Sequence, residues 1–291
     1  MSDPVTLLVS PFIEFGFMRR ALVASLAIAL GSGPIGVFLM LRRMSLMGDA
    51  MSHAILPGAA AGFLVAGLSL PAMSLGGLIA GLVVALAAGL VSRHTQLRED
   101  ASLAAFYLLS LALGVLLISV YGSNVDVIHV LFGSVLGVDN LALLQVAAIA
   151  SLTLVVLAVI YRPLVVECFD PEFLRAVGGG GEAVHLIFLV LVVLNLVAAF
   201  QALGTLMAVG LMMLPAAASR FWSRDLWAMT LAAVTIAALS GYVGLILSFH
   251  ADLPSGPAIV LTAGACYLGS IFLGRSGGLV WRWWHPPHLE A

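Results

Sequence analysis

The sequence predicts an all-α, polytopic transmembrane helical bundle of about eight or nine spans with one short re-entrant or interfacial helix. Composition is the first observation: 62% of the 291 residues are hydrophobic and only 9% are charged, whereas soluble domains carry about 25% charged residues. The second is that apolar runs of bilayer length recur along the chain. The third is that the arginines fall between these runs. We therefore expect residues 1–291 to form a single transmembrane domain.

Nine segments have the length and hydropathy of a membrane span. In order they are 21–41, 45–66, 71–91, 103–120, 141–161, 183–201, 203–218, 226–247 and 256–274. A further stretch, 127–138, is too short to span comfortably, and polar turns flank it, so we expect a re-entrant or interfacial helix there. Residues 1–20 contain three phenylalanines near Glu14 and are expected to form an amphipathic segment along the outer surface.

Arginine placement predicts the orientation of the chain. All twelve basic residues are arginine, and basic residues concentrate in cytoplasmic connections. With the amino terminus outside and the carboxyl terminus inside, only Arg19 and Arg20 lie outside. The ten inside are Arg42, Arg43, Arg93, Arg98, Arg162, Arg175, Arg220, Arg224, Arg275 and Arg282.

The absence of lysine excludes two kinds of chemistry. A phosphate-binding P-loop and a Schiff-base enzyme both need a lysine amine, so the chain is not expected to be an enzyme that hydrolyses ATP by the P-loop route. Neither HExxH nor GxSxG occurs, which argues against an intramembrane protease. No basic tract suggests nucleic acid, and Cys168 and Cys266 form no CxxC pattern.

Asp49 and His53 are the first candidate functional residues. They are four residues apart in an apolar segment, so on a helix the carboxylate and the imidazole share one face. Ionisable groups are costly in hydrocarbon and mark transport paths, although an interhelical hydrogen bond would also explain them. Pro57, one turn later, removes a helical hydrogen bond and suits a cavity wall.

The second candidate is the pair His250 and Asp252, in a proline-containing connection at the outer end of the span 226–247. It could collect a cation outside the membrane, or it could be an ordinary loop that ends a helix. Imidazole with carboxylate suits zinc and also manganese or ferrous iron, because no thiolate narrows the choice.

The third candidate is the inner loop 162–182, which contains a short amphipathic helix. Asp170 is its expected cap, Pro171 its first residue and Gly178 its terminator, while Glu172 favours the positive end of the helix. An apolar stripe on such a helix, beside polar residues, favours docking to a partner. The stripe comprises Phe173, Leu174 and Val177, beside Arg175 and Glu172.

Two weaker patterns concern packing. Small residues recur at Gly77, Gly81, Ala85 and Gly89, a spacing that lets helices approach closely within the bundle or, less favoured, at a dimer seam. Asn195 in the span 183–201 is expected to form an interhelical hydrogen bond, as is Gln201 at the end of the same span.

Four ordered motifs resemble the zinc/manganese/iron permeases of bacterial ABC importers over nearly the whole chain. They are Leu41 to Gly58, Leu131 to Gly137, Phe169 to Phe173 and Asp252 to Pro257. The resemblance implies a homodimeric, cobalamin-importer-like permease of the bacterial cytoplasmic (inner) membrane. Its expected partners are two cytoplasmic ABC ATPase subunits and an extracytoplasmic metal-binding protein.

The resemblance also implies residue roles. Asp49 and His53 match residues that line the metal path, the stretch Asp170 to Gly178 matches the loop that couples to the ATPase, and His250 and Asp252 match a region near the outer gate. No permanently bound cofactor is expected, and zinc is the favoured cargo, with manganese or iron as the alternative. A proton-coupled secondary cation transporter is a further alternative, in which Asp49 and His53 relay protons.

Overall fold

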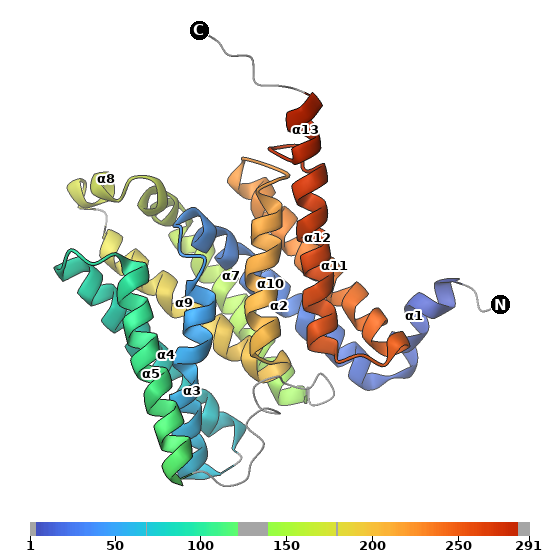
Figure 1. The fold of residues 1–291 in the computed structure, drawn as a ribbon, viewed down its shortest axis with the longest axis horizontal. Helices are drawn as coiled ribbons and strands as arrows, with labels where there is room; N and C mark the ends of the chain where they lie inside the picture. Colours follow the sequence, from blue (N-terminus) through green and yellow to red (C-terminus); the bar gives the residue numbers. More distant parts are fainter. Residues whose placement is uncertain (1–3, 68, 122–138, 179, 285–291) are drawn as a thin grey trace.

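The computed structural model describes residues 4–67, 69–121, 139–178 and 180–284, and every regular element in these ranges is an α-helix. Figure 1 shows the helices packed as one bundle with α8 and α13 projecting at its upper end. The elements are α1 Pro4–Glu14, α2 Gly16–Leu41, α3 Met47–Ala66, α4 Leu70–His94, α5 Glu99–Tyr121, α7 Asn140–Phe169, α8 Pro171–Ala176, α9 Gly181–Leu203, α10 Thr205–Ser219, α11 Leu226–Ala251, α12 Ser255–Leu273 and α13 Leu279–Trp284.

Eight of the described helices are long and apolar enough to cross a membrane, and α10, with 15 residues, is a shorter apolar helix. The all-α transmembrane bundle is thus confirmed, and α10 occupies the place of the predicted span 203–218. The predicted short helix 127–138 lies outside the described residues. In Figure 1, α5 ends and α7 begins at the same, lower end of the bundle.

Two segments have other helix boundaries than the sequence predicts. Phe15 has extended backbone, φ −109° and ψ 115°, which separates α1 from α2, so the outer segment 1–20 is divided and α2 already begins at Gly16. The inner loop 162–182 is shorter than predicted, because α7 continues through Pro163 to Phe169. Leu164 is fully buried, and its packing keeps this extra length of helix against the bundle.

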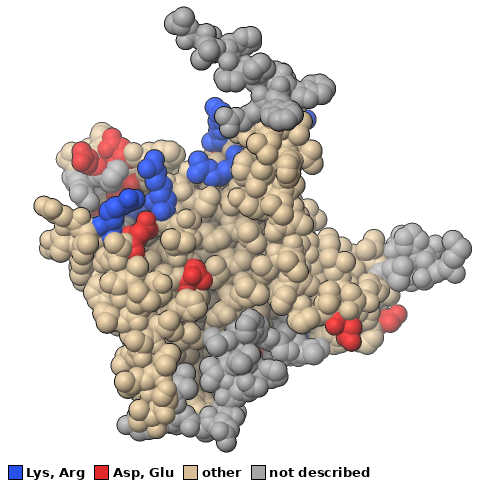
Figure 2. Space-filling view, viewed as in Figure 1, with Lys and Arg blue, Asp and Glu red and all other residues tan. Residues whose placement is uncertain are grey.

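Helices α2 and α9 form the centre of the bundle, since most of each is buried, whereas α5 is the most exposed of the long helices. Successive long helices run in opposite directions, which brings the connections after α2, α4, α7 and α10 to the upper end in Figure 1. Basic side chains gather at this end on the face seen in Figure 2. We call it the arginine-rich end.

Glycines permit the closest helix contact, between α3 and α4. A Cβ atom added to Gly58 would collide with the backbone of Gly76, and one added to Gly62 would collide with that of Ala72. The predicted small-residue pattern on α4 also packs inside the chain, because Gly77 and Gly81 lie against Ile55 of α3. This pattern therefore serves packing within the bundle rather than a dimer seam.

Asn195 forms the predicted interhelical hydrogen bond. Its Nδ2 donates to Thr153 Oγ1 of α7 at 2.7 Å and to the Leu191 carbonyl at 2.9 Å, and the side chain is 4% exposed. The bond ties the central helix α9 to α7.

Candidate metal path

A tight turn before α3 places the aspartate–histidine pair. Arg43 has a positive φ of 60°, and the Met44 N–H donates back to the Leu39 carbonyl at 2.9 Å. The chain therefore reverses within a few residues, and Asp49 falls in the first turn of α3. Negative charge is favoured there because the free N–H groups of a helix start carry partial positive charge.

Asp49 and His53 lie on one face of α3, as the spacing predicts. His53 Nε2 is 3.9 Å from Asp49 Oδ1, which is too long for a hydrogen bond. Two ligand atoms that share one ion, each roughly 2.1 Å from it, lie about 3.0–3.6 Å apart. A small rotation of either side chain would therefore let both bind one cation.

Helix α5 supplies the neighbours of this pair. The Tyr107 ring stacks on the His53 imidazole with centroids 6.3 Å apart, and Ser110 Oγ donates to the Ala54 carbonyl at 3.0 Å. Pro57 has no N–H, so the His53 carbonyl lacks its usual helical donor and is a further oxygen beside the imidazole. Neither Tyr107 nor Ser110 was a predicted site residue.

The side chains of Asp49 and His53 are exposed on the surface of the single chain. The side chains of His53 and Asp49 are 45% and 67% exposed, although α3 has the length and hydropathy of a span. Exposure of a charge to lipid at the bilayer centre costs about 2.5–3.5 kcal/mol on insertion scales. Asp49 is the third residue of α3 and lies near the end of the span, where this cost is smaller. Water or a second protein surface over this face would remove it. Ser52 turns inward instead, where its Oγ donates to the Asp49 carbonyl at 2.7 Å.

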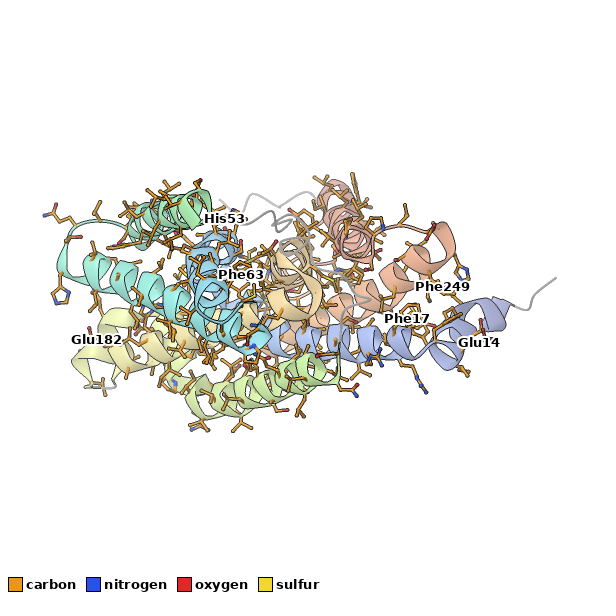
Figure 3. The ribbon with its side chains drawn as sticks, turned by 90° about the horizontal axis from the view of Figure 1, so that it is seen from below. Glu14, Phe17, His53, Phe63, Glu182 and Phe249 are labelled. Carbon is orange, nitrogen blue, oxygen red and sulfur yellow. The ribbon has the colours of Figure 1, made fainter. Side chains whose placement is uncertain are left out.

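His250 and Asp252 lie away from this pair. His250 is in the last turn of α11, and Asp252 follows it with φ 53°, so both are exposed at the end of the helix. In Figure 3, the neighbouring Phe249 is next to Phe17 and Glu14, on the other side of the bundle from His53. Among the described residues no group of three or more His, Cys, Asp and Glu side chains could hold a metal ion. The four predicted ligands thus form two separate pairs in the single chain.

The short helix α8 is built as the capping pattern predicts. Asp170 Oδ1 accepts the Phe173 N–H at 2.9 Å, and Gly178 has a positive φ of 72° after the helix end. The predicted apolar stripe divides, because Leu174 is buried against the bundle whereas Phe173 and Val177 are exposed. Phe169, at the end of α7, is 70% exposed and adds to this apolar surface.

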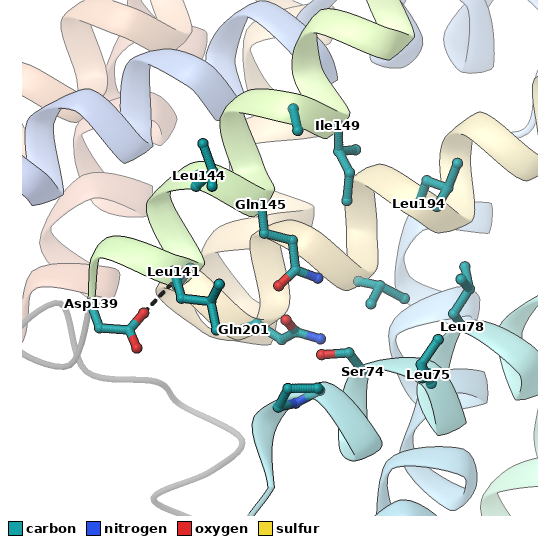
Figure 4. A pocket seen from close by; sticks show the side chains of 14 residues that line it. Ser74, Leu75, Leu78, Asp139, Leu141, Leu144, Gln145, Ile149, Leu194 and Gln201 are labelled. Atoms are coloured by element: carbon teal, nitrogen blue, oxygen red, sulfur yellow. Dashed lines mark hydrogen bonds between the residues drawn. The ribbon is translucent and has the colours of Figure 1, made fainter.

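A cavity of about 480 Å³ lies between α4, α7 and α9 at the end opposite the arginine-rich one. Figure 4 shows Gln145, Gln201 and Ser74 directed toward one another across it, with Asp139 at its edge. Its other walls are largely aliphatic. Gln201 therefore lines this cavity.

The sequence matches a known family of transport proteins. Residues 14–274 match the model of the ABC 3 transport family. The manganese import system permease protein ScaB of Streptococcus parasanguinis is 33% identical over 260 residues, which are 89% of this chain and 91% of ScaB. The chelated iron transport system membrane protein YfeD of Yersinia pestis is 30% identical over 254 residues, 87% of this chain and 84% of YfeD.

A solved structure supports the same conclusion. PsaBC from Streptococcus pneumoniae in complex with Fab contains a chain that is 29% identical, with a TM-score of 0.81 and coverage of 94% of this chain and 97% of that chain. These matches confirm the resemblance to metal-ion ABC importer permeases. The relatives named above belong to manganese and iron systems, so the expectation of zinc as the favoured cargo has no support from them. With the family model matched across most of its length, the chain belongs to the ABC 3 transport family.

Proposed function

We propose that this chain is the permease subunit of an ABC importer for a divalent transition metal, with manganese or ferrous iron ahead of zinc. The observation that carries the proposal is the exposed Asp49–His53 pair on a transmembrane helix. Oxygen and imidazole ligands without a thiolate suit these metals. The names of the relatives point to the same cargo.

The open face of α3 supports a path between two copies of the chain. A second permease copy over this face would cover the pair from lipid and could add ligands to the two that one copy offers. The proposed complex contains two permease copies, two cytoplasmic ATPase subunits at α8 and an extracytoplasmic metal-binding protein. It lies in the bacterial cytoplasmic membrane with the amino terminus outside, as the arginine distribution favours.

His250 and Asp252 are proposed as a second, outer cation contact. Both are exposed at the end opposite the arginine-rich one, in the connection between α11 and α12. This position suits transfer of the cargo from an extracytoplasmic protein. Their separation from Asp49 means that the ion would move between the two pairs rather than bind both at once.

The proposal is tested by metal-dependent growth of a strain whose uptake relies on this importer. Asp49→Asn removes the negative charge of one ligand and His53→Ala removes the other ligand. Neither change adds bulk, so growth at limiting manganese or iron should be lost. Asp100→Asn and His94→Ala make the same chemical changes at the arginine-rich end and should grow normally. Membrane insertion, followed by immunoblot, should be equal in all four. Normal growth of both α3 variants would rule out the path through this pair.

A further inference from the structure

The turn that leads into α3 is held to the central helix α9 at the arginine-rich end. Arg42 Nη2 donates to His185 Nδ1, and the guanidinium carbon is 5.6 Å from the centroid of the Phe188 ring. Since arginine offers only donors, Nδ1 of His185 must be the acceptor here. His185 and Phe188 are 2% and 0% exposed. The Arg42 side chain is therefore held against a buried part of α9, just before the start of α3.

A second contact lies one turn earlier on the same face of α9. The Glu167 side chain, 7% exposed, lies against Gly181, where an added Cβ would be 2.5 Å from Glu167 Oε2 and 3.2 Å from Leu174 Cδ2. Gly181 is the first residue of α9, whose free N–H groups favour a carboxylate. Gly181 and His185 are four residues apart and so share a face. Leu174 of α8, which is buried, completes this contact.

We propose that Glu167, His185 and Arg42 are positioning residues that link α8 to the start of α3. The inference rests on the proposed function, because it requires an ATPase that docks on α8. Displacement of α8 would move Leu174 and Glu167, which contact the first turn of α9. A movement of α9 would in turn move Arg42 and the turn before Asp49. Two steps of this route are contacts, from Glu167 and Leu174 to Gly181 and from His185 to Arg42. The other two run along α9 and along the turn that leads into α3.

Two buried polar atoms lie on this route. Glu167 Oε2 and Arg42 Nη1 are both buried and have no hydrogen-bond partner in the described part of the chain. A buried polar atom without a partner is destabilising. A rearrangement of α8 and α9 that gives either atom a partner would remove this local cost, and coupling between distant sites requires such alternative arrangements.

The test is the number of metal ions imported per ATP hydrolysed by the complete complex in vesicles, with manganese as the probe. His185→Leu removes the acceptor for Arg42, and Glu167→Gln removes the buried charge. Both should lower the ratio by about threefold or more, while ATP hydrolysis and ATPase co-purification stay at wild-type levels. His185→Gln retains an acceptor and should restore the ratio. His94→Leu and Asp100→Asn are the matched controls at the same end of the bundle.

A double variant tests whether the residues act through each other. The double variant Arg42→Gln with His185→Leu should lower the ratio no further than the more impaired single variant. The reason is that both substitutions remove the same contact, the one between Arg42 and His185. An unchanged ratio in well-folded His185→Leu and Glu167→Gln would overturn the link. If His185→Leu fails to fold, unchanged ratios in Glu167→Gln and Arg42→Gln would overturn it equally. A wild-type complex without ATP-dependent uptake would instead overturn the proposed function.

Discussion

At the scale of single residues, Gly58 determines how closely α3 and α4 approach. Its Cα faces the backbone of Gly76, and any side chain there would collide with a carbonyl oxygen that cannot move independently of α4. Overpacking of this kind typically costs about 1–3 kcal/mol. Because Asp49 and His53 lie on the same helix, this contact also fixes the orientation of the Asp49–His53 pair.

We predict that Gly58→Ala lowers the free energy of unfolding of the purified chain by about 1–3 kcal/mol. Gly264→Ala, in the middle of α12 where an added Cβ meets nothing within 4 Å, is the control. It should be neutral or stabilising by up to about 1 kcal/mol, because alanine favours helix. Thermal unfolding in detergent compares the two. Equal midpoints for both variants would contradict the packing account.

Sequence spacing predicts which residues lie side by side when they share a helix. It does not predict which residues of different helices meet. Asp49 and His53 were predicted because four residues make about one turn. Tyr107 could not be paired with His53, nor Arg42 with His185, because these partners are distant in sequence and meet only in the packed bundle. Their residue types alone gave no signal of the contact.

At the scale of elements, local rules predict where α8 begins and ends but not which of its apolar residues are buried. Asp170 and Gly178 bound the helix as the capping pattern predicts, because caps depend on the adjacent backbone. The roles of its apolar residues depend on the bundle, which buries Leu174 and leaves Phe173 and Val177 exposed. The proposed docking surface is therefore Phe169, Phe173 and Val177.

We predict that Phe173→Asp prevents co-purification of the ATPase subunit. Phe173 is 56% exposed, so the substitution should leave the fold intact. A charge in the centre of an apolar interface should weaken binding by about 2 kcal/mol or more, roughly thirtyfold. Leu97→Asp, at a residue 54% exposed in the connection between α4 and α5, is the control and should bind normally. An intact complex with Phe173→Asp would exclude docking at this surface.

Helix ends were the weakest predictions, for a physical reason. Hydropathy windows stop at charged residues and therefore predict a span that ends at residue 161, before Arg162. Helix α7 continues to Phe169 because Leu164 and Glu167 pack inward. Similarly, Arg19 and Arg20 lie within α2 rather than before it. Long charged side chains snorkel to the interface, and hydropathy alone does not register this.

At the scale of the whole molecule, the bundle combines two surfaces in one structure. The arginine-rich end presents α8, and the open face of α3 presents the Asp49–His53 pair, with the central helix α9 between them. The transmembrane class followed directly from composition. The spatial relation of the two surfaces could not be predicted, because it depends on how distant helices pack.

The central claim, an ATP-driven metal path through Asp49 and His53, is tested most directly by the initial rate of radioactive manganese uptake into vesicles that hold the complete importer. We predict uptake that requires ATP at the ATPase side, and a fall of about tenfold or more in Asp49→Asn, consistent with loss of a charged ligand worth about 1.4 kcal/mol or more. Uptake driven by a proton gradient without ATP, or an unchanged rate in Asp49→Asn, would contradict the account.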